Sequence, residues 1–168
     1  MDFNFKGRDI INGYDFTTQE LCHIMDTAMI YEKRVKSGEA IKDMEGMLVA
    51  TLFFEPSTRT RLSFESAMLS LGGKVLGVAS AESSSASKGE TVADTVRVVS
   101  CYSDIIAMRH PKEGAPLVAS MHAQVPVINA GDGGHMHPTQ TLADLLTIHR
   151  ECGRLDGLTI GLCGDLLY

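Results

Sequence analysis

The fold of this chain is decided by residues 47–61, MLVATLFFEPSTRTR. The apolar run Met47–Phe54 has the length and composition of a buried strand, and a helix pattern follows over residues 57–71. A helix N-terminus has free backbone N–H groups, which favour an anion. Because hydroxyl groups and the guanidinium groups of Arg59 and Arg61 are added here, this turn is predicted to bind phosphate.

The two arginines also have a plainer interpretation, as solvated side chains after a helix cap. Two cations beside a helix start oppose the helix dipole, so an acidic neighbour or a bound anion should offset them. A regular helical turn cannot aim both side chains into one site. We therefore predict that Arg59 faces the ligand and that Arg61 forms an ion pair with Glu65, four residues on.

Hydrophobic spacing and turn residues predict the other elements of the chain. One helix should begin near residues 15–20 and end at Ser37-Gly38, and strands should alternate with helices thereafter. The expected helices span about 91–102, 115–122 and 139–152, and the expected strands span 74–79, 104–108, 125–129 and 158–163. This alternation predicts an α/β fold, a parallel sheet with helices on both faces. The serine-rich residues 80–90 are predicted to form a mobile loop.

Unusual polar residues follow three of the predicted strands, in Glu55–Arg61, Arg109–Pro111 and Gly131–Gln140. In parallel sheets, ligands bind outside the carboxyl ends of the strands. The sequence therefore predicts that these three segments meet in one site, which binds a small phosphorylated molecule and performs polar chemistry on it.

Three interpretations of His137 remain open from the residues alone. It could pair with His135 as a metal ligand, although only Asp132 lies nearby in the sequence as a further ligand. It could donate a hydrogen bond to a carbonyl oxygen that gains charge, with Gln140 one turn later contacting an amide group. It could also simply cap the helix that follows. Similarly, Lys88 is either a solvated lysine or a phosphate clamp, and composition favours the first.

Composition limits the other possible functions. The 168 residues suffice for one domain and the start of a second, and the net charge of −6 argues against a nucleic-acid-binding surface. No apolar run approaches the roughly 20 residues that span a membrane, and the first residues lack the apolar centre of a signal peptide. The four scattered cysteines are expected to be buried or half-buried free thiols in a cytoplasmic protein.

Three motifs, STRTR at 57–61, MRHP at 108–111 and HPTQ at 137–140, resemble signatures of the aspartate/ornithine carbamoyltransferase family. Their order and spacing match, and the likeness covers nearly the whole chain. KGET at 88–91, RHP at 109–111 and NAGDG at 129–133 favour the aspartate branch, as does Thr139, where ornithine enzymes usually carry Cys. An ornithine-type or other carbamoyltransferase, and a non-catalytic phosphate-binding module, remain as alternatives.

The resemblance implies a reaction and a role for each site residue. Carbamoyl phosphate would donate its carbamoyl group to the α-amino group of L-aspartate, giving N-carbamoyl-L-aspartate and phosphate in pyrimidine biosynthesis, without a metal or an organic cofactor. The carbonyl oxygen would contact the expected catalytic residues Thr60, Arg109 and His137, and Gln140 would contact the amino group. The expected phosphate ligands are Ser57, Thr58, Arg59 and Thr60, together with Ser84 and Lys88 from a neighbouring subunit.

The resemblance also implies how the whole protein is organised. Family enzymes are trimers with shared sites, and some pair with regulatory chains. Their chains are roughly twice as long as this one and carry a second, aspartate-binding domain. We therefore expect residues 1–153 to be the carbamoyl-phosphate-binding domain and residues 154–168 to begin the aspartate-binding domain. On this expectation most of the aspartate site is missing, and the chain alone is inactive.

Overall fold

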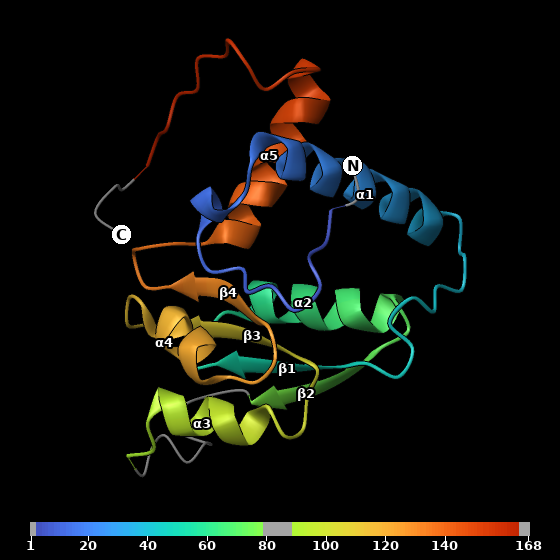
Figure 1. The fold of residues 1–168 in the computed structure, drawn as a ribbon. Coiled ribbons are helices and arrows are strands. Elements are labelled where there is room, and N and C mark those ends of the chain that lie inside the picture. Colours follow the sequence, from blue (N-terminus) through green and yellow to red (C-terminus); the bar gives the residue numbers. More distant parts are fainter. Residues whose placement is uncertain (1–2, 79–88, 165–168) are drawn as a thin grey trace.

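A computed structural model describes residues 3–78 and 89–164 of the chain. Its centre is a parallel sheet of four strands in the order β2-β1-β3-β4 (Figure 1). The strands are β1 (Leu48–Phe53), β2 (Lys74–Val78), β3 (Ile105–His110) and β4 (Val127–Asp132). The predicted α/β class is confirmed.

Helices cover both faces of this sheet (Figure 1). The helices are α1 (Thr18–Lys36), α2 (Thr58–Ser70), α3 (Val92–Val99), α4 (Ala115–His122) and α5 (Pro138–Cys152), with a short 3-10 helix, η1 (Gly13–Asp15). Helices α2 and α5 lie on one side of the sheet, α3 and α4 lie on the other, and α1 packs against α5. All five helices were predicted from the sequence.

Apolar side chains on the two faces of the sheet form the core. On one face Leu52, Ile106 and Met108 are buried against Val96 of α3 and Ala119 of α4. On the other face a smaller cluster joins Val49 and Ala107 to Met68 of α2. Burial of each large apolar side chain contributes about 1.5–3 kcal/mol, so the central strands are rigid supports for the loops at their carboxyl ends.

The carboxyl ends of three elements differ from the prediction by two or more residues. Strands β3 and β4 continue through His110 and Asp132, beyond the predicted ends at residues 108 and 129, because Phe53 pairs with Arg109 and His110 pairs with Asp132 in the ladder. Strand pairing uses backbone groups, so it continues at these positions although their side chains are polar. Helix α3 ends at Val99, where tighter turns take over from the α-helical hydrogen bonds.

The predicted fifth strand, Leu158–Cys163, is wrong. These residues are described and mostly exposed, and within the described residues they pair with no strand. A strand exists only where a neighbour satisfies its backbone groups, and the local apolar pattern cannot supply one. The expected burial of the cysteines is also wrong, because all four lie within the described residues as exposed, free thiols.

Residues 3–78 and 89–164 include no helix with both the length and the apolar character needed to cross a membrane.

Candidate active site

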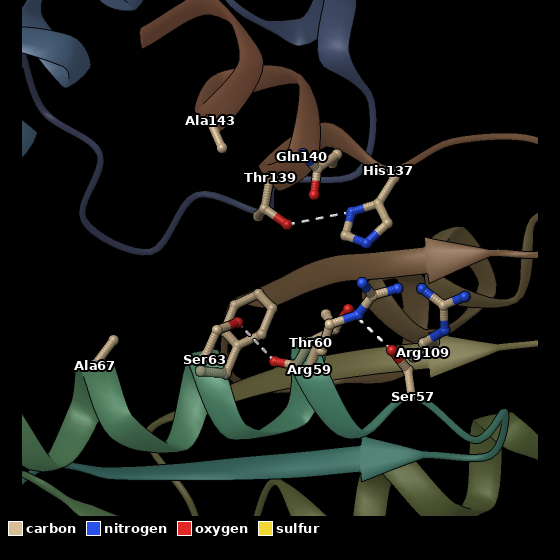
Figure 2. A pocket seen from close by; sticks show the side chains of 11 residues that line it. Ser57, Arg59, Thr60, Ser63, Ala67, Arg109, His137, Thr139, Gln140 and Ala143 are labelled. Carbon is tan, nitrogen blue, oxygen red and sulfur yellow. Dashed lines mark hydrogen bonds between the residues drawn. The ribbon is translucent and has the colours of Figure 1, made fainter. Parts of the chain in front are cut away.

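A cavity of about 760 Å³ opens between α2 and α5, beside the carboxyl ends of β1, β3 and β4 (Figure 2). The side chains that line it come from the start of α2, from β3 and from the start of α5. They are Ser57, Arg59, Thr60, Ser63, Phe64, Ala67, Arg109, His137, Thr139, Gln140 and Ala143. The prediction that the three segments after the strands meet in one site is confirmed.

The first turn of α2 leaves backbone N–H groups available to a ligand. The N-cap residue Ser57 donates its hydroxyl to Thr60 Oγ1 at 3.0 Å instead of accepting a bond from the helix backbone. The first helical bond runs from the N–H group of Arg61 to the carbonyl of Ser57. In the described part of the chain, the N–H groups of residues 58–60 have no acceptor, which is the arrangement of an anion site.

The two arginines of this turn have separate environments, as the sequence predicts. Arg59 lines the cavity, whereas Arg61 forms an ion pair with Glu65, with Nε and Oε1 3.3 Å apart. The same carboxylate oxygen accepts a hydrogen bond from the buried Thr51 hydroxyl at 3.0 Å. The contact between Arg61 and Glu65 confirms the predicted ion pair. Thr58 is not among the described residues that line the cavity.

Arg109 reaches the cavity from β3 and is held by a carboxylate. Its Nη2 donates to Glu55 Oε1 at 2.6 Å, and its Nη1 donates to the carbonyl of Ala130 at 3.3 Å. Its Nε is buried and has no hydrogen-bond partner among the described residues. A positive charge is thus held at the cavity wall by Glu55 until an anionic or polar ligand competes for it.

Glycine is required at position 131 beside this arginine. A Cβ atom there would lie 2.6 Å from Arg109 Nη1 and 3.3 Å from His137 Cδ2. The backbone φ of Gly131 is also +117°, which side chains rarely tolerate. Because Gly131 has no side chain, Arg109 and His137 can both pack against its backbone and lie close to each other.

His137 occupies the N-cap position of α5, but its side chain makes no capping hydrogen bond and instead lines the cavity near Arg109 (Figure 2). Its Nδ1 lies 3.3 Å from Thr139 Oγ1. Burial, and secondly the cation of Arg109, lower the pKa of His137 below its usual value of 6.5. The imidazole is therefore mostly neutral at pH 7, and the neutral form has one N–H group and one lone pair.

This lowered pKa predicts a pH dependence. In an NMR titration, the His137 ring should titrate below pH 6.5, and Arg109→Gln should raise its midpoint because a nearby cation is removed. The native state then binds fewer protons than the unfolded chain, so this contribution to stability is complete above about pH 6.5 and is lost as the pH falls. A midpoint at or above 6.5 in the unsubstituted chain would contradict this assignment.

Gln140 is oriented by a neighbour on α5. Its Nε2 donates to Asp144 Oδ1 at 2.9 Å, which fixes the side-chain amide because a carboxylate only accepts hydrogen bonds. The Gln140 carbonyl oxygen therefore faces the cavity as an acceptor (Figure 2). A ligand N–H group is its natural partner.

The alternative of a metal site at the two histidines has little support in the geometry. His135 Nδ1 contacts Asp132 Oδ2 at 3.1 Å, whereas His137 lines the cavity. The described residues contain no group of three or more His, Cys, Asp or Glu side chains that could hold a metal ion.

Sequence reasoning missed several residues of the cavity. Ser63, Phe64 and Ala67 follow Thr60 at helical spacing, so this face of α2 could have been identified once Thr60 was placed. Thr139 and Ala143 are related in the same way on α5. Glu55 carried a weaker signal, a carboxylate directly after a buried strand. The predicted phosphate ligands Ser84 and Lys88 lie outside the described residues, as do residues 80–88 of the predicted loop.

Comparison with known proteins identifies relatives of this chain. Residues 8–150 match the family model described as "Aspartate/ornithine carbamoyltransferase, carbamoyl-P binding domain". The aspartate carbamoyltransferase catalytic subunit of Clostridium acetobutylicum is 62% identical over 163 residues, which are 97% of this chain and 52% of the relative. That of Clostridium kluyveri is 61% identical over 163 residues, 97% of this chain and 53% of the relative.

The solved structures that this chain resembles also include aspartate transcarbamoylases. Aspartate transcarbamoylase from Trypanosoma cruzi, in complex with carbamoyl phosphate and aspartate, superposes with a TM-score of 0.92 at 43% identity, covering 96% of this chain and 53% of that chain. The catalytic subunit of the M. jannaschii enzyme gives a TM-score of 0.85 at 52% identity, covering 90% and 49%. The chain thus spans about half the length of the relatives that it matches.

Proposed function

The chain belongs to the aspartate/ornithine carbamoyltransferase family, and we propose that it forms the carbamoyl-phosphate-binding part of an aspartate carbamoyltransferase. The observation that carries this proposal is the convergence of Arg59, Arg109, His137 and Gln140 on one cavity. Each of these side chains has a matching group on carbamoyl phosphate. The relatives compared above are aspartate enzymes, which favours aspartate over ornithine as the acceptor.

The phosphate group is proposed to bind at the start of α2. The available N–H groups of residues 58–60 and the helix dipole favour an anion, and Arg59 adds a guanidinium group. The hydroxyls of Ser57 and Thr60 complete the set on this chain. Thr58 would contribute through its backbone. Ser84 and Lys88 of a neighbouring subunit stay proposed as further phosphate ligands.

The carbamoyl group is proposed to lie between Arg109, His137 and Gln140. In the reaction, the α-amino group of aspartate forms a bond to the carbamoyl carbon, and negative charge develops on the carbonyl oxygen, where Thr60, Arg109 and the neutral His137 would donate hydrogen bonds. The bond from that carbon to the phosphate oxygen then breaks, and the proton that the amine loses passes to the departing phosphate. The carbonyl oxygen of Gln140 would accept from the carbamoyl amino group.

Because Glu55 pairs with Arg109, we predict that Glu55 weakens the binding of carbamoyl phosphate. Glu55→Gln should raise the affinity for carbamoyl phosphate about three- to tenfold, because a neutral amide competes less strongly for the guanidinium group. Calorimetric titration measures this change. Glu45→Gln, at a glutamate that pairs with Lys42, is the control for the change in net charge. Weaker binding by Glu55→Gln would instead mean that Glu55 holds Arg109 in its binding position.

The family membership supports proposals about the whole protein. We propose that residues 1–153 form the carbamoyl-phosphate-binding domain and that 154–168 begin an aspartate-binding domain, since the family model ends at residue 150 and α5 ends at Cys152. We further propose a cytoplasmic homotrimer with shared sites that acts in pyrimidine biosynthesis. L-aspartate would bind mainly outside this chain, and regulatory chains are possible partners of such a trimer.

Calorimetric titration with carbamoyl phosphate and with inorganic phosphate tests the proposed function. Inorganic phosphate can use only the contacts at the start of α2, whereas carbamoyl phosphate can also use Arg109, His137 and Gln140. We therefore expect carbamoyl phosphate to bind at least about tenfold more tightly. Equal affinities would contradict the proposed contacts to the carbamoyl group, and binding of neither would contradict the site itself.

A further inference from the structure

The carboxylate of Asp132, at the end of β4, has four hydrogen-bond donors although the residue is only 1% exposed. Its Oδ1 accepts from the N–H group of Met136 at 2.9 Å and from Asn129 Nδ2 at 3.1 Å. Its Oδ2 accepts from the N–H group of Gly114 at 2.8 Å and contacts His135 Nδ1 at 3.1 Å. One buried side chain therefore joins β4, the start of α4 and the loop that leads to α5.

The same residue closes that loop through its backbone. The N–H group of Asp132 donates to the carbonyl of Met136 at 3.1 Å, and its carbonyl accepts from the N–H group of His135 at 3.2 Å. Both backbone polar groups of Met136 are thus bound by one residue. The next residue is His137, so the position of its backbone is set directly by Asp132.

The end of β4 before Asp132 is also held by side-chain hydrogen bonds. Buried Asn129 donates from Nδ2 to the carbonyl of Ile11 at 3.0 Å and accepts at Oδ1 from the N–H group of Gly131 at 2.9 Å. Gly131 in turn lies against the side chains of Arg109 and His137. A shift of the loop would therefore change the distance between these two cavity side chains.

We propose that Asp132 is a positioning residue that holds His137 where it can donate a hydrogen bond to the carbamoyl oxygen. This inference rests on the proposed function, and Asp132 itself touches no substrate. Its role depends on an ionised carboxylate, because only that form offers acceptors to all four donors. Burial alone would raise the pKa of Asp132, but the hydrogen bonds outweigh burial and lower it.

The substitution Asp132→Asn tests this role. The side-chain amide is nearly isosteric, but its NH₂ group would face donors and break part of the network. The matched control is Asp9→Asn, because Asp9 Oδ1 accepts from the N–H group of Val127 at 2.8 Å, at the opposite end of the same strand. His135→Ala removes one donor from a side chain that is 43% exposed, so it tests the network even where the Asn variant fails to fold.

Two measurements separate positioning from a purely structural role. The first is the ratio of affinities for carbamoyl phosphate and inorganic phosphate, and the second is the NMR signal of the His137 ring. Asp132→Asn should lower the ratio about tenfold, leave inorganic phosphate binding within about twofold, and shift the His137 signal. His135→Ala should produce a smaller change in the same direction, and Asp9→Asn should change neither quantity.

Other outcomes would overturn the inference. An unchanged ratio and an unchanged His137 signal, in whichever of the two network variants folds, would show that Asp132 does not position this side chain. Parallel loss of affinity for both anions would indicate a structural role only. If the unsubstituted chain prefers neither anion, the proposed function fails, and the His137 signal alone still decides whether Asp132 positions the ring.

Discussion

Arg59→Ala should lower the affinity for both carbamoyl phosphate and inorganic phosphate by about 10- to 100-fold. Arg59 lines the cavity at the start of α2, and a hydrogen bond to a charged group contributes about 1.5–3 kcal/mol. Because both anions carry phosphate, they should lose affinity to a similar extent. Calorimetric titration of Arg59→Ala and of the unsubstituted chain with each anion measures the loss.

Arg61 supplies a matched control for this prediction. Arg61→Ala removes the same charge two residues away, but this side chain pairs with Glu65. We expect its affinity for either anion to change by no more than about threefold, through screened long-range electrostatics alone. Equal losses in the two variants would show that net charge, and not the position of Arg59, determines anion binding.

Gly131→Ala, a small substitution directly behind the cavity residues Arg109 and His137, should have a large effect. The added methyl group would lie 2.6 Å from Arg109 Nη1, so the guanidinium group must move from the position in which we propose that it contacts the carbamoyl group. We expect the affinity for carbamoyl phosphate to fall about tenfold or more, with a smaller loss for inorganic phosphate. The positive φ should also cost about 1–3 kcal/mol of unfolding free energy.

Gly153 serves as a control that separates the steric clash with Arg109 from the cost of a positive φ. It also has a positive φ, +68°, but an added Cβ there would meet no atom within 4 Å among the described residues. Gly153→Ala should therefore lose stability in denaturant unfolding and keep its affinity for both anions. If Gly131→Ala binds carbamoyl phosphate as tightly as Gly153→Ala does, Arg109 does not need its observed position.

The parts of the site that sequence could predict depend on local spacing. The strand β1, the helix start after it with its unbonded N–H groups, and the Arg61–Glu65 pair all follow from patterns within a few residues. The meeting of the three segments followed from one topological rule for parallel sheets. The residues that line α2 beyond Thr60 also required only helical spacing.

The parts that sequence could not predict depend on contacts between distant residues. Glu55 and Arg109 are 54 positions apart, and Gly114 and Asp132 are 18 apart, so only the register of the sheet brings them together. The failed strand at 158–163 shows the same limit, since its apolar pattern indicates a strand but does not provide a partner.

A crystal structure of this chain with carbamoyl phosphate would test the central claim most directly. We predict that the phosphate oxygens contact the backbone N–H groups of residues 58–60 and the Arg59 side chain. The carbonyl oxygen should lie within hydrogen-bond distance, about 2.7–3.2 Å, of Arg109 and His137, and the amino group should face the Gln140 oxygen. Carbamoyl phosphate bound elsewhere, or bound with its carbonyl group turned away from Arg109 and His137, would contradict the proposed site.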